Sequence, residues 1–368
     1  WHYYIRYIGA GAVAFGGMIT LVRAIPTILE TFKTGLRKIS NKDKIKEERT
    51  DRDLPMLVVI GGAVILGLCL WLVLSFWTAT EIRIIPNLLV AFLMVIFSFF
   101  FVTVSSRIVG LIGSSSNPVS GMTITTLLLT SLIFSLLGWT SDAHMVIALS
   151  VGAVVCISIA IAGDTSQDLK TGFLIGATPW KQQIGEFIGV LTSAIFVGWV
   201  ILRLHKGVGI GSEELPAPQA TLMSLVVKGV ITGDLPWRFV IIGIFLAAIV
   251  ELVGIRSLPF AVGVYLPLYL TTPIMAGGLL RYLTEKTKDE NILKRRRESG
   301  ILFSSGLIAG SALVGVGLAL VASYSGTFVT TLEIGYLWMG PFSNIASLFI
   351  FAGLCLLLLS FINKKQSS

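Results

Sequence analysis

A polar segment, Gly113–Gly121, interrupts a long apolar run, and every residue in it except Val119 is Gly, Ser, Asn or Pro. Proline favours the first turn of a helix, and Asn or Ser favours the cap before it. The segment therefore predicts a helix that begins near Pro118 and is capped by Asn117 or a neighbouring serine. The free N–H groups and the positive dipole end of such a helix attract an anion such as a carboxylate.

Substrate-binding candidates come from this segment and from a proline-rich stretch farther along the chain. Non-helical backbone at membrane depth is tolerated only where it is buried in protein or lines a wet cavity, and the alternative is an ordinary turn outside the membrane. The residues between Glu251 and Pro273 include several prolines, which predict either a discontinuous or a kinked helix. The candidates for binding substrate are Ser114, Ser115, Ser116, Asn117, Ser120, Thr123, Tyr265 and Thr271.

Acidic residues in apolar surroundings are the candidates for proton coupling. A second polar interruption, Gly163–Gly172, holds Asp164 and Asp168, which share one face if this segment is helical. They could carry a proton or orient a substrate amine; the alternative is a helix cap in a loop that positions its neighbours. Glu251, in a short apolar segment, is the third candidate. Interfacial positions or internal pairs are expected for Glu186, Arg23 and Glu30.

The elements that position these residues are predicted to be membrane helices. The chain has 368 residues, 54% of them hydrophobic and 13% charged, whereas soluble domains carry about 25% charged residues. The charges concentrate in residues 37–53 and 281–298, and elsewhere uncharged runs reach the roughly 20 residues that cross a bilayer. Because Lys and Arg favour cytoplasmic loops, both charged stretches are predicted to be cytoplasmic loops. Tyr282 is the only aromatic residue in these two stretches of the sequence, so a nucleic-acid partner is not expected.

This pattern predicts an all-α fold, a polytopic transmembrane helical bundle with broken or re-entrant helices. Residues 1–368 are expected to form a single transmembrane transporter domain with ten or eleven membrane segments. Placing both charged stretches in the cytoplasm requires an even number of crossings between them, which favours a crossing at residues 221–235. Three pairs of glycines at four-residue spacing, Gly172/Gly176, Gly185/Gly189 and Gly306/Gly310, predict close helix packing.

Enzyme motifs are missing from the sequence. It contains neither G-x-x-x-x-G-K-[ST] nor H-E-x-x-H, and its three histidines, His2, His144 and His205, lie far apart. We therefore expect a protein that is not an enzyme, with no cofactor and no resident metal.

Three ordered segments resemble hallmark segments of the oligopeptide transporter (OPT) superfamily. The first is Gly113–Thr123, and the second is Gly163–Gly172 together with Lys181-Gln182-Gln183. The third is Ala217-Pro218-Gln219-Ala220, followed by Leu235-Pro236-Trp237. The N-P-G and K-I-P-P-R signatures of the fungal and plant peptide-transporting branch are missing, so the chain is more similar to the prokaryotic and yellow-stripe-like branches.

The resemblance implies secondary active, proton-coupled uptake of small oligopeptides or related carboxylate-bearing solutes. The alternatives are symport of a metal chelate of the siderophore or nicotianamine kind, and a passive channel. Superfamily members are much longer, so we expect this chain to be the C-terminal part of a transporter whose N-terminal half completes the cavity. The other expected partners are the substrate, protons, the lipid of a bacterial inner membrane and further copies of the chain.

Overall fold

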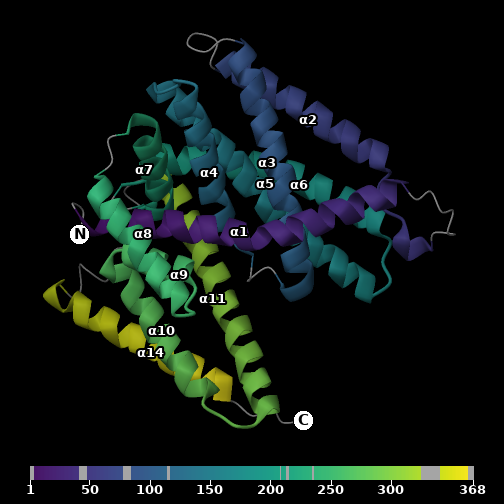
Figure 1. Ribbon diagram of the computed structural model, residues 1–368. Helices are drawn as coiled ribbons and strands as arrows, with labels where there is room; N and C mark the ends of the chain where they lie inside the picture. Colours follow the sequence, from purple (N-terminus) through teal and green to yellow (C-terminus); the bar gives the residue numbers. More distant parts are fainter. Residues whose placement is uncertain are drawn as a thin grey trace. The chain divides into compact units, whose positions relative to one another are not determined.

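The computed structural model describes residues 4–40, 48–77, 84–113, 117–207, 209–212, 215–233, 236–324 and 340–363. Within these ranges the chain is helical and has no strand (Figure 1). Seven of the described helices are long and apolar enough to cross a membrane. The prediction of an all-α polytopic membrane protein is therefore confirmed.

The chain forms two compact units, which are described separately. The first comprises Trp1–Thr192 and Pro218–Leu266, and the second Ser193–Ala217 and Pro267–Ser368. The helices of the first unit are α1 (Ile5–Ser40), α2 (Met56–Trp77), α3 (Ile84–Ile112), α4 (Val119–Leu136), α5 (Asp142–Leu174), the start of α6 (Pro179–Gly207), α7 (Pro218–Thr232), α8 (Trp237–Leu252) and α9 (Ser257–Tyr265). Those that lie wholly in the second unit are α10 (Leu268–Glu285), α11 (Glu290–Tyr324) and α14 (Ser343–Asn363).

Helix α4 lies at the centre of the first unit, in contact with α1, α3, α5 and α7. Ten of its 18 residues are buried, several of them Thr or Ser. The hydroxyls of Thr123, Thr125 and Thr126 each donate to the carbonyl oxygen four residues earlier. These three hydroxyls are thereby satisfied within the helix, whereas the buried hydroxyls of Thr130 and Ser131 have no hydrogen-bond partner among the described residues.

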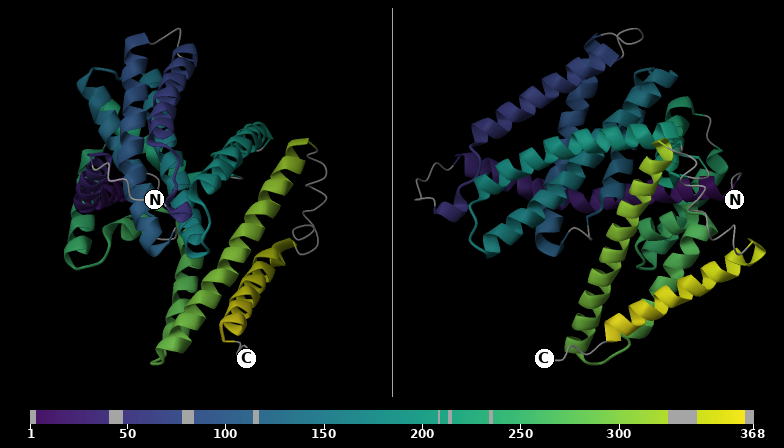
Figure 2. Two further views of the ribbon diagram at one scale, coloured as in Figure 1. Left: turned by 90° about the vertical axis from the view of Figure 1, so that its right-hand side faces the viewer. Right: turned by 180° about the vertical axis from the view of Figure 1, so that it is seen from behind.

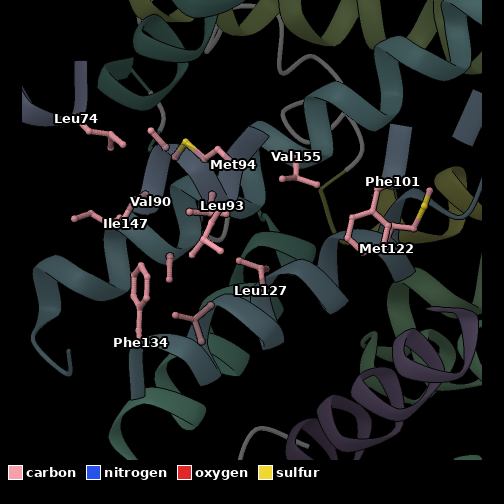
Figure 3. Packing of buried hydrophobic residues seen from close by; sticks show 14 of the residues in the cluster. Leu74, Val90, Leu93, Met94, Phe101, Met122, Leu127, Phe134, Ile147 and Val155 are labelled. Carbon is pink, nitrogen blue, oxygen red and sulfur yellow. The ribbon is translucent and has the colours of Figure 1, made fainter. Parts of the chain in front are cut away.

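The largest apolar cluster joins α3, α4 and α5. Figure 3 shows Phe101 of α3 beside Met122 of α4, and Leu127 of α4 facing the region of Val155 on α5. By contrast, α2 and the start of α6 expose long rows of apolar side chains, including Leu57, Phe76 and Phe187. Exposed apolar surface of this extent is what lipid covers in a membrane protein, so α2 and α6 have the character of helices at the periphery.

Helix α1 approaches α8 without side chains between the two backbones. A Cβ atom on Gly11 would overlap the carbonyl of Val240, and one on Gly243 would overlap the carbonyl of Ile8. Small residues permit this approach, which matters because lipid gives helices no hydrophobic reason to associate. Of the glycines predicted to pack closely, Gly172 of α5 does so, because a Cβ atom there would overlap the Gln182 side chain of α6. Around the pairs Gly185/Gly189 in the first unit and Gly306/Gly310 in the second, no packing atom lies within 4 Å of a Cβ position. For these pairs the prediction of close packing is wrong.

The predicted interruption at Gly163–Gly172 is also wrong, because α5 runs unbroken from Asp142 to Leu174. No Gly or Pro lies between Asp164 and Thr171, so nothing stops the helix when its sequence becomes polar. At 1.5 Å per residue, 33 residues span roughly 50 Å, against about 30 Å of bilayer hydrocarbon. The polar end of α5 therefore exceeds what a membrane crossing needs.

The proline-rich stretch between Glu251 and Pro273 was predicted to be either a discontinuous or a kinked helix, and the structure has a discontinuous one. Helix α9 ends at Tyr265 and α10 begins at Leu268. Between them Leu266 and Pro267 have extended backbone angles, with ψ of 142° and 153°. The neighbouring segments α7 and α8 are 15 and 16 residues long, shorter than a full crossing.

The charged stretch 281–298 lies in the second unit and is mostly helical. It comprises the end of α10, the connection Lys286–Asp289 and the start of α11. Figure 2 shows α14, in yellow, beside the lower part of α11 within this unit. The stretch predicted to be a loop is therefore a helical hairpin, and its cytoplasmic location stays a prediction.

Candidate functional site

Asn117 joins three helices at the break between α3 and α4. Its amide Nδ2 donates to Ser105 Oγ of α3 at 2.9 Å, and that hydroxyl donates to the Ile159 carbonyl of α5 at 2.8 Å. Gly113 ends α3 with a φ of 92°, a conformation that glycine adopts without strain. Ser114, Ser115 and Ser116 lie outside the described residues.

The predicted cap of α4 by Asn117 is wrong. Pro118 occupies the N-cap position, and no side chain caps the helix. The Asn117 side chain instead faces α3 and α5, because Ser105 and the Ile159 carbonyl offer its amide group a buried partner. The second and third N–H groups of a helix have no intrahelical acceptor, so those of Ser120 and Gly121 stay available.

An unsatisfied acceptor also lies at this break between α3 and α4. Asn117 Oδ1 is buried and has no hydrogen-bond partner in the part of the chain that the structure describes. A buried polar atom without a partner costs about 1–3 kcal/mol, so such a site gains by taking up water or a ligand. Acceptor and donors together suit a molecule that carries both an ammonium and a carboxylate group.

The two polar segments singled out in the sequence meet at this point. A Cβ atom on Gly163 would lie 2.7 Å from Asn117 Nδ2, so only glycine leaves room for the amide. Arg49 donates to Gly176 O at 2.7 Å and to Thr178 Oγ1 at 2.8 Å, which holds the turn after α5 against the first charged stretch. Within the first unit, the start of the second polar segment therefore lies against Asn117 of the first, and Arg49 holds the turn beyond its end.

A cavity of about 590 Å³ lies on another face of α5, between α2, α5 and α6. Glu186 lines it; its Oε1 is buried without a hydrogen-bond partner among the described residues, and the Thr165 hydroxyl bonds to the carboxylate. Gln183 closes one side by donating to Asp53 Oδ1 at 3.3 Å and accepting from the Leu54 N–H at 3.0 Å. The remaining lining is mostly apolar, as in small-molecule sites.

Glu186 also lines a second cavity, of about 420 Å³, together with Asp168. The like charges of the two carboxylates repel each other there. The sequence indicated only that Glu186 is the one acidic residue of an apolar 29-residue helix. Its position on two cavities depends on the way α6 packs against α5, which no local pattern encodes.

The other substrate-binding candidates divide into three groups. Ser120 and Thr123 lie on the first turns of α4, next to Asn117. Tyr265 is buried in a different apolar cluster, and its hydroxyl donates to the Pro218 carbonyl at 3.2 Å, which indicates packing. Thr271 lies in the second unit, where its hydroxyl bonds to Leu268 O. Among the described residues no three His, Cys, Asp or Glu side chains cluster as metal ligands.

The acidic candidates have contrasting surroundings. Asp164 and Asp168 are exposed on α5. Glu251, at the end of α8, forms an ion pair with Arg23 of α1 and accepts the Ser257 N–H at 2.8 Å. The internal pair expected for Arg23 is thereby confirmed, and Glu251 has a structural role at the start of α9.

Replacing Glu251 by alanine is expected to destabilise the first unit by about 1–3 kcal/mol, because the Ser257 N–H loses its acceptor. Arg23 is 63% exposed, so the ion pair itself contributes little. Glu251→Gln keeps an acceptor and is expected to cost less. Thermal unfolding of the purified variants in detergent measures both, and equal losses would contradict the assigned hydrogen bond.

Comparisons with known proteins agree with this arrangement. A family profile described as "OPT oligopeptide transporter protein" matches residues 1–322. The Haemophilus influenzae protein named "Putative oligopeptide transporter" is 29% identical over 89% of this chain and 58% of its own length. The "Probable metal-nicotianamine transporter YSL5" of Arabidopsis thaliana is 23% identical over 49% of this chain and 28% of its own length.

The chain thus spans well under two thirds of the curated relatives that it matches. No solved structure matches it. The family match covers both polar segments that meet at Asn117 and Gly163, as well as the helices that hold them. On this evidence the chain belongs to the OPT oligopeptide transporter family.

Proposed function

We propose that the chain forms part of a secondary active transporter that moves a small oligopeptide or a related carboxylate-bearing solute across the cell membrane. The observation that carries the proposal concerns Asn117, just before the first turn of α4: its Oδ1 is buried and has no partner among the described residues. An ammonium group would donate to that oxygen, and a carboxylate would accept from the N–H groups of Ser120 and Gly121. A zwitterion satisfies both sets of groups at once.

A metal chelate is the second candidate, because several relatives are named metal-nicotianamine transporters. A chelate that presents carboxylates could engage the same helix start. Uptake by the full-length protein in proteoliposomes separates the two candidates if labelled dipeptides, tripeptides and an iron–nicotianamine chelate are each supplied with and without a pH gradient. Uptake that never exceeds equilibration would indicate a passive channel and would contradict secondary active transport.

Proton coupling is the second part of the proposal, with Asp168 as the proton carrier. Asp168 is exposed on α5 and lines a cavity together with Glu186 of α6, so a proton that enters this cavity reaches both carboxylates. Asp164 lies one turn earlier on α5 and is not among the residues that line either cavity. A role of Glu251 in proton coupling stays a prediction with less support than that of Asp168. Its carboxylate already forms an ion pair with Arg23 and accepts a hydrogen bond from the Ser257 N–H.

Asp168→Asn is expected to abolish accumulation driven by a pH gradient while solute exchange across the membrane continues. A proton that moves through 100 mV supplies roughly 2.3 kcal/mol, which supports a ratio of about fifty between the solute concentrations inside and outside. The variant should lose this accumulation. Asp164→Asn, a matched change on the same helix, is expected to keep most of the gradient-driven uptake. Uptake at the original level in Asp168→Asn would remove this residue from the coupling.

A further inference from the structure

A cavity of about 360 Å³ in the second unit lies between α10, α11 and α14. Three arginines, Arg281, Arg296 and Arg297, line it together with a single acid, Glu285. One carboxylate against three guanidinium groups leaves two positive charges in the lining. An excess of this kind at a cavity favours an anionic occupant.

The arginines have unused donors. Arg281 Nε and Arg297 Nε both donate to Glu285 Oε1, at 2.8 and 3.1 Å, and Arg296 Nη1 donates to Thr284 O at 3.0 Å. Each guanidinium has five N–H donors, so most of them remain available to a ligand. Arg296 Nε is buried and has no hydrogen-bond partner among the described residues.

Glu285 holds two of these arginines in place. The hydrogen bond from Arg281 lowers the pKa of the Glu285 carboxyl below its ordinary value. The carboxylate therefore stays ionised at neutral pH and accepts a hydrogen bond from each of the two guanidinium groups. Guanidinium groups gathered in this way suit phosphate, which accepts paired N–H bonds from arginine.

The cavity also has an apolar side. Ile301 of α11, which is exposed, and Leu358 and Ile362 of α14 line it opposite the arginines. Figure 2 shows α11 and α14 side by side at the end where α11 begins. A lining that is cationic on one side and apolar on the other matches a molecule with an anionic head and a hydrocarbon tail.

We propose that this cavity binds an anionic phospholipid, with the headgroup phosphate on Arg281, Arg296 and Arg297 and an acyl chain along Ile301, Leu358 and Ile362. The predicted cytoplasmic position of residues 281–298 supports a lipid source, because anionic lipids attract basic segments at that surface. Inorganic phosphate carries the same anionic group as the lipid headgroup, but it has no hydrocarbon chain to contact the apolar side of the cavity.

Native mass spectrometry of the full-length protein in a neutral detergent tests the proposal, with phosphatidylglycerol and phosphatidylcholine titrated separately. Phosphatidylglycerol is expected to bind more tightly, and Arg296→Gln is expected to weaken its binding about tenfold. Lys294→Gln is the matched control: it removes one positive charge from the same helix at an exposed position outside the cavity lining. It is expected to leave the affinity nearly unchanged.

A second variant, Ser304→Phe, tests the cavity independently in case Arg296→Gln does not fold. Ser304→Phe fills the cavity without changing any charge, and it should displace phosphatidylglycerol as well. The proposal is overturned if both lipids bind equally, if Arg296→Gln matches Lys294→Gln, or if Ser304→Phe binds like the unsubstituted protein. Millimolar inorganic phosphate that competes fully with the lipid would show that the site recognises the ion alone, which also overturns it.

Discussion

Gly243→Val is expected to prevent assembly of the first unit, with the largest loss of stability of any single substitution considered. The new side chain would have to occupy the space of the Ile8 carbonyl on α1. Backbone cannot move aside as a side chain can, so the cost should exceed the roughly 3 kcal/mol typical of overpacked sites. The yield of monodisperse protein after size exclusion in detergent measures the effect.

Gly189→Val on α6 is the matched control for this variant. No atom of the first unit packs within 4 Å of a Cβ position there, so the same increase in volume should be tolerated. If Gly243→Val purified as well as Gly189→Val and unfolded at the same temperature, the close approach of α1 and α8 would be contradicted.

Asn117→Leu is expected to reduce solute uptake to background, a loss of at least about tenfold in uptake efficiency. Leucine has nearly the same size as asparagine. It removes both the hydrogen bond to Ser105 and Oδ1, which has no hydrogen-bond partner among the described residues. The initial rate of uptake by the full-length protein in proteoliposomes measures the loss, with the amount of inserted protein determined in parallel.

Ser105→Ala separates the two roles of Asn117. It removes the hydrogen bond that orients the amide but leaves Oδ1 available to a ligand, so uptake should fall less than in Asn117→Leu. Equal losses in the two variants would assign Asn117 to packing alone. Uptake that persists in Asn117→Leu would exclude the break before α4 from solute binding.

Much of the fold could be predicted because long, uncharged apolar runs in the sequence indicate membrane helices. Uncharged runs of roughly 20 residues predicted membrane helices, and α2, α3 and α14 are helices of at least this length. The prolines predicted a discontinuous or a kinked helix, and the structure has a discontinuous one between α9 and α10. The polar residues of Gly163–Gly172 predicted an interruption, but polar side chains do not end a helix. Outside lipid, water satisfies polar side chains, and the backbone continues as a helix until a residue such as Gly176, with its φ of 72°, ends it.

The candidate site could be predicted only in part. The sequence indicated Asn117 as a candidate, but it assigned the residue to a helix cap, whereas the side chain bridges to Ser105 of α3. Such a bridge depends on contacts between helices distant in sequence. For the same reason four-residue spacing missed Gly11 and Gly243: each faces the backbone of another helix, and no repeat marks either one.

The unbroken course of α5 has a mechanical consequence for the proposed transport cycle. Gly163, against Asn117, and Asp168, in the cavity with Glu186, are five residues apart on one helix, about 7–8 Å along its axis. No flexible joint between them can absorb a shift of either end. In the proposed cycle α5 would move as one rigid body. A shift of Asp168 when it binds a proton would then move Gly163, in the wall of the proposed solute site, by about the same distance.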